Sequence, residues 1–208
     1  YGLNVRIARF HNVFGPFGVP FYNSFISTFS YQLTHAQEPK IEIDAEVGLI
    51  YVDELVKQIL SIIEKDEKSI KIERLAETSR YKVSDILKIM ERYKSDYIDK
   101  VIIPELDTVF KKNLFNTFRS YIDLNNHFPF HYKLNSDERG TFVETMKLNT
   151  GGQVSYSTTI PGITRGNHFH TRKIERFAVI KGEATIKMRK INTKEIFEFK
   201  LNGSEPSF

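Results

Sequence analysis

The stretch from Gly162 to Gly182, GITRGNHFHTRKIERFAVIKG, constrains the fold of this chain more than any other. His168 and His170 are two residues apart, and residues two apart in a strand point to the same face, so both imidazoles can reach one point. Glu175 follows a short polar break and can return on the next strand. Two histidines and one carboxylate form a ligand set that suits Zn, Fe, Mn or Ni. The stretch therefore predicts a metal centre built on strands.

The spacing of these five residues resembles the first motif of the cupin family, whose members are jelly-roll barrels. That family's second motif carries a further His ligand, and the sequence stops at Phe208 before such a motif. The resemblance implies that His168, His170 and Glu175 bind a metal, with zinc favoured. The sequence leaves open whether the metal is catalytic or structural. The alternative is a solvated strand with two unpaired histidines.

Composition narrows the classes of protein to consider. The length of 208 residues allows one to two domains. The net charge of +4, from 30 basic and 26 acidic residues, is too small to indicate a nucleic-acid partner, and we interpret the basic residues as scattered. The absence of cysteine excludes disulfides and thiolate metal sites and fits a reducing cytoplasm. No apolar run is long enough to cross a membrane. Both ends look cut, so we expect a piece of a longer cytoplasmic protein.

The pattern of elements changes near residue 125. Before it, short β-rich runs alternate with amphipathic helices, which is typical of an α/β fold. We expect strands at 4–10, 40–43, 49–52 and 69–75 and helices at 24–35, 53–65, 83–93 and 104–121. After it, strand-like runs follow one another with polar breaks, as in a small barrel. We expect these strands at 141–148, 153–159, 167–170, 176–180, 184–190 and 195–201. The predicted domains are 1–125 and 126–208.

Two motifs in the first half carry a second resemblance. Residues 9–16, RFHNVFGP, resemble the RxxNVxGP motif of the extended short-chain dehydrogenases/reductases, and residues 51–56, YVDELV, resemble their second signature. The match covers residues 1–122 and implies the sugar-binding part of an NAD(P)-binding Rossmann-type domain. It places Asn12 near the sugar nucleotide, with a turn role as the alternative. The family's glycine-rich fingerprint and Tyr-x-x-x-Lys pair lie upstream of the first motif. We therefore expect this chain alone to bind no NADPH and to transfer no hydride.

The order of the two halves resembles the CapF-type enzymes of capsular polysaccharide biosynthesis. The matching segments include NVRIARFHNVFGP, FNTFRSYI, DERGTFVE and PGITRGNHFH. The resemblance implies a fragment of a two-step enzyme that acts on a UDP-linked 4-keto-6-deoxy amino sugar. The cupin domain would epimerise C3, and the reductase domain would reduce the C4 ketone with NADPH. A ketone at C4 acidifies the C3 proton, so a base and an acid on opposite faces suffice for inversion.

The second half also resembles the deoxysugar 3,5-epimerases. Residues 137–144, DERGTFVE, match their DxRGxFxE segment, which implies that Arg139, Phe142 and Glu144 bind the nucleotide. The alternatives are a surface ion pair for Arg139 and a packed strand residue for Phe142. Residues 165–168, RGNH, match an RGxH segment and imply that Arg165 holds phosphate, a role that suits a fork-shaped cation.

The two resemblances assign His168 different roles, because the epimerases use that histidine as the catalytic base. A metal-bound imidazole has no lone pair left on its ligating nitrogen. The HxH spacing followed by Glu favours ligation, so the base for epimerisation is unassigned. Lys173 and Tyr156 are the candidates for it.

Several other residues receive weaker interpretations. Tyr81 and Tyr93, each followed by Lys, are interpreted as helix-surface residues, and His11 as a residue that lines the sugar pocket. Two other classes of function stay open. One is a non-catalytic sugar-binding module, or a degenerate remnant, in which the cupin mainly forms a homodimer through its sheets. The other is a metal-dependent oxygenase.

Overall fold

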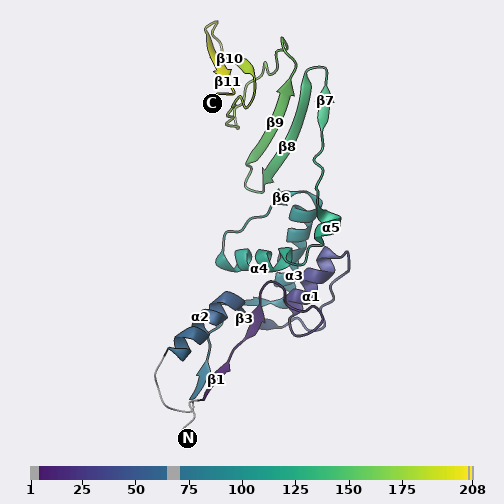
Figure 1. Cartoon of the computed structure of the whole chain (residues 1–208), viewed down its shortest axis with the longest axis vertical. Helices are drawn as coiled ribbons and strands as arrows, with labels where there is room; N and C mark the ends of the chain where they lie inside the picture. Colours follow the sequence, from purple (N-terminus) through teal and green to yellow (C-terminus); the bar gives the residue numbers. More distant parts are fainter. Residues whose placement is uncertain (1–4, 65–70, 206, 208) are drawn as a thin grey trace. The chain divides into compact units, whose positions relative to one another are not determined.

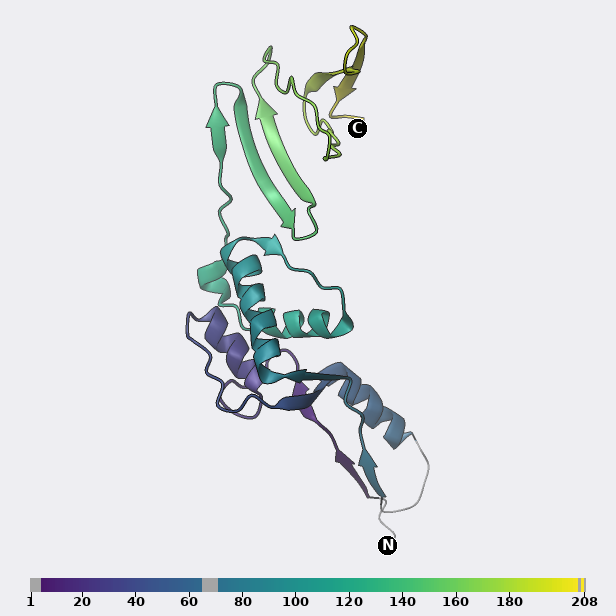
Figure 2. The same ribbon diagram turned by 180° about the vertical axis from the view of Figure 1, so that it is seen from behind.

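The computed structural model describes residues 5–64, 71–205 and 207 (Figures 1 and 2). The chain separates into two compact units, residues 1–163 and residues 164–208. The first unit begins as an α/β structure and continues into an antiparallel sheet. The second unit contains a β-hairpin and the stretch with the paired histidines.

The first unit holds two small sheets in its α/β part. Strand β1 (Arg6–Arg9) pairs in parallel with β4 (Lys71–Arg74). In the other sheet, β3 (Glu46–Tyr51) is central and pairs in parallel with β2 (Asn12–Phe14) and antiparallel with β5 (Ser79–Lys82). These strands confirm most of the runs expected from the β-rich segments. The expected strand at 40–43 is wrong, because these residues form no regular structure.

Three of the helices pack against one another and carry the core. They are α1 (Phe25–Thr34), α3 (Val83–Tyr93) and α4 (Val109–Arg119), seen together in Figures 1 and 2. Helix α2 (Val52–Ile63) follows β3 directly, and two short elements, η1 (Lys94–Asp99) and α5 (Leu124–His127), complete this part. Amphipathic periodicity predicted the four longer helices, since each turns an apolar stripe inward.

The start of α4 corrects the prediction of a helix from residue 104. Residues Ile102–Ile103 form strand β6, and Pro104 is buried in the connection after it. The helix begins only after Thr108, whose hydroxyl accepts a hydrogen bond from the Lys111 amide at 3.1 Å. A threonine at this position satisfies an amide that the first turn leaves free. The proline was therefore a poorer marker of the helix start than the threonine.

The core of the first unit is rich in aromatic residues. Tyr93 is 2% exposed, and its hydroxyl donates to the Lys111 carbonyl at 2.9 Å. The ring of Tyr81 stacks on Phe110 with centroids 4.2 Å apart. The interpretation of Tyr81 and Tyr93 as helix-surface residues is therefore wrong. The buried residues of this cluster are Phe14, Ile26, Phe29, Leu33, Leu49, Tyr51, Val83, Ile86, Met90, Tyr93, Phe110, Leu114, Phe115 and Phe118.

The first unit continues into a second β-rich part. Strand β8 (Gly140–Leu148) pairs antiparallel with β7 (Asn135–Asp137) and β9 (Gln153–Thr159), which confirms the strands expected at 141–148 and 153–159. Strand β6 adds to the same sheet, because Ile102 and Ile103 pair in parallel with Lys147 and Leu148. The sheet therefore includes chain from both sides of residue 125, and the domain boundary there stays a prediction.

The second unit is built on the hairpin of β10 (Glu183–Arg189) and β11 (Ile196–Asn202). These strands confirm the expectations for 184–190 and 195–201. The strands expected at 167–170 and 176–180 are not formed. Gly166 and Asn167 have φ angles of 98° and 62°, in the left-handed region that an extended strand does not enter. This backbone reversal directly before His168 explains why the histidine segment is irregular.

Candidate metal centre

His168, His170 and Glu175 come together in the second unit although no strand holds them. Their ligand atoms all lie within 4.8 Å of one another. The two imidazole rings meet edge to face, with centroids 4.7 Å apart. His170 Nε2 lies 3.1 Å from Glu175 Oε2. The three side chains expected from the sequence to lie together do so. They are not brought together by the alternating side-chain directions of a strand, because this segment forms no strand.

Glu175 also contacts Lys173, whose Nζ lies against Oε1 of the carboxylate. This hydrogen bond, followed by the proximity of His170, lowers the pKa of Glu175 below its ordinary value. The carboxylate is therefore ionised at neutral pH, the form that binds a metal. The Lys173 ammonium group is thus engaged by a carboxylate.

The donor set fits a divalent transition metal. Two imidazole nitrogens and one carboxylate oxygen are ligand types that zinc accepts, at bond lengths that place tetrahedral ligand atoms about 3.4 Å apart. The 3.1 Å separation of His170 and Glu175 is already near this value. The spread of 4.8 Å over the whole group requires a small inward movement. His168 and His170 are exposed, so such a side-chain rotation is sterically open.

The residues expected to bind the nucleotide divide between the two units. Arg139, Phe142 and Glu144 lie in the first unit and Arg165 in the second. The guanidinium of Arg139 pairs with Asp137, with Nε and Nη2 3.0 and 2.5 Å from Oδ2, which raises the pKa of Arg139. Phe142 is half-buried on β8, and Glu144 accepts from Gln153 Nε2 at 3.1 Å.

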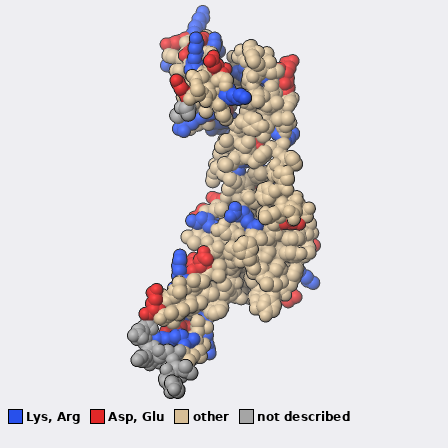
Figure 3. All heavy atoms as spheres, viewed as in Figure 1, with Lys and Arg blue, Asp and Glu red and all other residues tan. Residues whose placement is uncertain are grey.

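The second unit carries a local excess of positive charge. Residues 164–208 contain ten Lys and Arg residues but only five Asp and Glu residues, whereas the whole chain has 30 and 26. Figure 3 shows Lys and Arg side chains over the surface of this unit. The other 20 basic residues lie outside this unit, so the basic residues are spread along the chain while their excess over acidic residues is local. A local excess of positive charge attracts anionic ligands such as a diphosphate.

Contact of Asn12 with the sugar nucleotide stays a prediction. Asn12 lies on β2, and its Nδ2 donates to the Gly48 carbonyl of β3 at 3.2 Å. Near Gly48, the carboxylate of Glu77 pairs with Arg80 at 2.7 Å and with His11 at 3.4 Å. A Cβ at Gly48 would lie 1.8 Å from Glu77 Oε2. The glycine therefore leaves the space that this charged group occupies.

Two features were not anticipated from the sequence. Glu54 is the third residue of α2, and its Oε2 accepts from the Thr78 hydroxyl at 2.5 Å and from the Tyr51 amide at 3.3 Å. An acidic residue in the first turn of a helix is the signal that could have revealed this cap.

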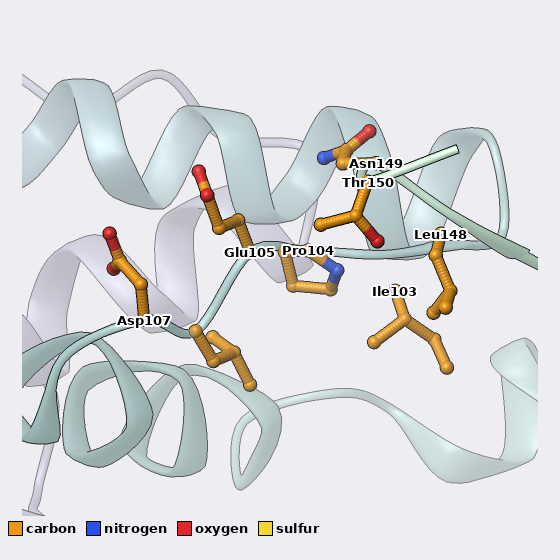
Figure 4. A pocket seen from close by; sticks show the side chains of 8 residues that line it. Ile103, Pro104, Glu105, Asp107, Leu148, Asn149 and Thr150 are labelled. Carbon is orange, nitrogen blue, oxygen red and sulfur yellow. The ribbon is translucent and has the colours of Figure 1, made fainter. Parts of the chain in front are cut away.

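The second feature not anticipated from the sequence is a pocket of about 290 Å³ in the first unit. Figure 4 shows its lining residues, which include Glu105, Leu148 and Asn149 but none of the predicted site residues.

Comparisons with known proteins place these observations in a family context. Residues 135–208 match the family model for the polysaccharide biosynthesis C-terminal domain. The crystal structure of CapF with the inhibitor 3-isopropenyl-tropolone aligns with 100% of this chain and 60% of that chain, at a TM-score of 0.85 and 34% identity. The chain resembles CapF along its whole length. The resemblance expected from the sequence is therefore confirmed.

Further relatives agree with this likeness. CapF, the capsular polysaccharide assembling protein of Staphylococcus aureus, aligns with 100% of this chain and 56% of its own, at a TM-score of 0.78 and 34% identity. UDP-2-acetamido-2,6-beta-L-arabino-hexul-4-ose reductase of Pseudomonas aeruginosa is 32% identical over 98% of this chain and 55% of its own length. The chain thus spans little more than half the length of the relatives it matches. No helix in the described ranges is long and apolar enough to span a membrane.

Proposed function

We propose that this chain is part of an enzyme that catalyses two successive steps in making a UDP-linked deoxy amino sugar for capsular polysaccharide. The observation that supports this proposal is the similarity to CapF over the entire chain, at 34% identity and a TM-score of 0.85. The curated relative is named as a reductase of a UDP-linked 4-ketohexose. A shared substrate class follows: a UDP-linked 4-keto-6-deoxy amino sugar.

The α/β part of the first unit would hold the sugar nucleotide for reduction of the C4 ketone. Its resemblance to the sugar-binding part of extended short-chain dehydrogenases/reductases supports this role. NADPH would supply the hydride. The family binds this cofactor at a glycine-rich fingerprint and uses a Tyr-x-x-x-Lys pair in catalysis, and neither motif occurs at the expected spacing in this sequence. Asn12 stays the candidate contact for the sugar nucleotide: its Nδ2 donates to the Gly48 carbonyl, and an asparagine amide has a second N–H and an oxygen with which to bind a ligand.

The cupin-like part would epimerise the sugar at C3. We assign His168, His170 and Glu175 as ligands of one zinc ion, supported by ligand atoms that lie within 4.8 Å of one another. These three residues would hold the ion, and the chemistry it would supply is Lewis-acid polarisation of a ketone oxygen, which favours loss of the neighbouring proton. The chain's own residues would bind the diphosphate: Arg165 in the second unit, where basic residues outnumber acidic ones ten to five.

In the first unit, the nucleotide-binding roles of Arg139, Phe142 and Glu144 stay part of the proposal. Asp137 already orients the Arg139 guanidinium through two hydrogen bonds, and such a fork can bind a phosphate on its remaining donors. Tyr156 and Lys173 stay the two candidates for the epimerisation base. Tyr156 is 46% exposed on β9 in the first unit, and Lys173 lies against Glu175 in the second.

Deuterium exchange at C3 tests the epimerase half directly. The chain is incubated in D₂O with the UDP-linked 4-keto-6-deoxy amino sugar and zinc, without NADPH, and the C3 proton is followed by NMR. We expect wild-type protein to replace the C3 proton faster than buffer does, and His168→Ala to lose this activity. A wild-type chain that exchanges no faster than buffer would instead support a non-catalytic binding or dimerisation module.

A further inference from the structure

The two carboxylate oxygens of Glu175 have different partners within the second unit. Oε2 lies 3.1 Å from His170 Nε2, and Oε1 lies against Lys173 Nζ. Lys173 and Glu175 are two residues apart in this irregular segment. The Glu175 side chain is 23% exposed and that of Lys173 is 59% exposed. The lysine thus covers one oxygen and leaves the other facing the imidazole.

We propose that Lys173 is a positioning residue that makes Glu175 a one-oxygen ligand for a divalent cation held with His168 and His170. This inference rests on the metal site proposed above and adds how that site is controlled. A carboxylate can bind a cation through one oxygen or through both. With Oε1 bound to the ammonium group, Oε2 is the oxygen offered beside the histidines. Lys173 therefore sets the number of ligand positions that the protein fills.

Lys173 also limits how tightly the site holds a cation. Its positive charge repels the metal, and its hydrogen bond withdraws negative charge from the carboxylate that would attract the metal. Replacing lysine by methionine keeps most of the side-chain length but removes both effects. Because the lysine is more than half exposed, solvent screens the interaction, and we expect the affinity to rise by about fivefold.

The neighbouring Arg172 provides a matched control for the charge alone. It is exposed and lies in the same four-residue segment between His170 and Glu175. Within the described ranges it makes no hydrogen bond or ion pair with Glu175. Arg172→Met removes the same charge from the same segment but leaves the Lys173–Glu175 pair intact. A general field effect would respond equally to the two substitutions, whereas a specific hold on Oε1 responds only to the change at Lys173.

Titration with Co²⁺ tests the proposal without reference to activity. Co²⁺ replaces Zn²⁺ as a probe whose visible absorption reports the number and type of ligands, and competition with a chromophoric chelator gives the Kd. We expect Lys173→Met to change the absorption band and to lower the Kd by about fivefold. Lys173→Arg, which keeps a donor for Oε1, should match wild type in both. Arg172→Met should leave the band unchanged and the Kd within about twofold.

Two results would overturn the proposal while leaving the metal site in place. One is a Lys173→Met variant with the wild-type band and Kd. The other is an Arg172→Met variant that reproduces every change seen at Lys173. A different result, wild-type protein that binds no Co²⁺ or His168→Ala protein that binds it as well as wild type, would refute the metal site and the role of Lys173 with it. Circular dichroism of each variant confirms that the fold is retained.

Discussion

Replacing Tyr93 by phenylalanine separates a hydrogen bond from the packing around it. Tyr93 is 2% exposed, and its hydroxyl donates to the Lys111 carbonyl at 2.9 Å. Lys111 lies inside α4, so its carbonyl keeps the amide partner that a helix supplies. Tyr93→Phe therefore leaves no buried group unpaired. We expect the free energy of unfolding at pH 8 to fall by about 1 kcal/mol, the net contribution of one hydrogen bond.

The same substitution should become harmless at high pH. Burial, with a smaller effect from Asp107, raises the pKa of Tyr93 well above its ordinary value of 10.0. A raised folded-state pKa gives stability that is complete below the unfolded-state pKa and is lost as the pH rises above it. The loss amounts to about 1.4 kcal/mol for each pH unit beyond that point. Wild type should therefore match Tyr93→Phe near about pH 10.7 and be less stable above it.

Urea unfolding followed by helical circular dichroism, at pH 8 and at about pH 11, measures this reversal. The other tyrosines are common to both proteins, so their ionisation cancels in the difference. Tyr22→Phe is the control, because Tyr22 is 77% exposed and should change stability at neither pH. A Tyr93→Phe variant that is equally destabilised at both pH values would refute the argument from burial. One as stable as wild type at pH 8 would refute the hydrogen bond.

Three further predictions concern the framework of the site. Phe118→Ala empties a position that is 0% exposed and should cost about 3–5 kcal/mol, seen as loss of a cooperative helical transition in urea. Asp44 accepts from the amide and hydroxyl of Ser84, which lowers its pKa. The stabilisation is present above its ordinary pKa and lost as the pH falls through the lowered value. The difference in Tm between wild type and Asp44→Ala should therefore close in acid, and an unchanged difference would contradict the stabilisation by these two hydrogen bonds. Gly140 has a φ of 134°, and a Cβ there would lie 2.2 Å from the Thr158 carbonyl. Gly140→Ala should thus abolish amide protection along β8, whereas Gly151→Ala, where φ is 91° and the space is open, should not.

Periodicity predicted the helices because a helix that buries one stripe must repeat its apolar residues every three to four positions. The interpretation of Tyr93 as a helix-surface residue rested on the lysine that follows it, not on this periodicity. Tyr93 completes that stripe one helical turn after Met90, which is 0% exposed. The start of α4 was predicted too early, because both a proline and a capping threonine mark helix starts. The helix begins after Thr108 and not at Pro104.

The candidate site could be predicted in composition but not in backbone geometry. The spacing of His168, His170 and Glu175 identified the residues that gather in the second unit. Alternation along a strand was the wrong reason, because Gly166 and Asn167 have positive φ angles and so end any extended run before His168. Glycine and asparagine adopt such angles more readily than other residues but do not require them. The pairing of Lys173 with Glu175 depends on side-chain rotamers. Asn12 could not be placed either, since its partner at Gly48 is 36 residues away.

Zinc binding by the intact 208-residue chain tests the central claim most directly. The protein is dialysed against Zn²⁺ and its bound metal is measured by elemental analysis, beside a His168→Ala, His170→Ala double variant. The account predicts one zinc ion per wild-type chain and none in the double variant. A wild-type chain that retains no zinc, or a double variant that retains as much as wild type, would contradict the assignment of these residues as a metal centre.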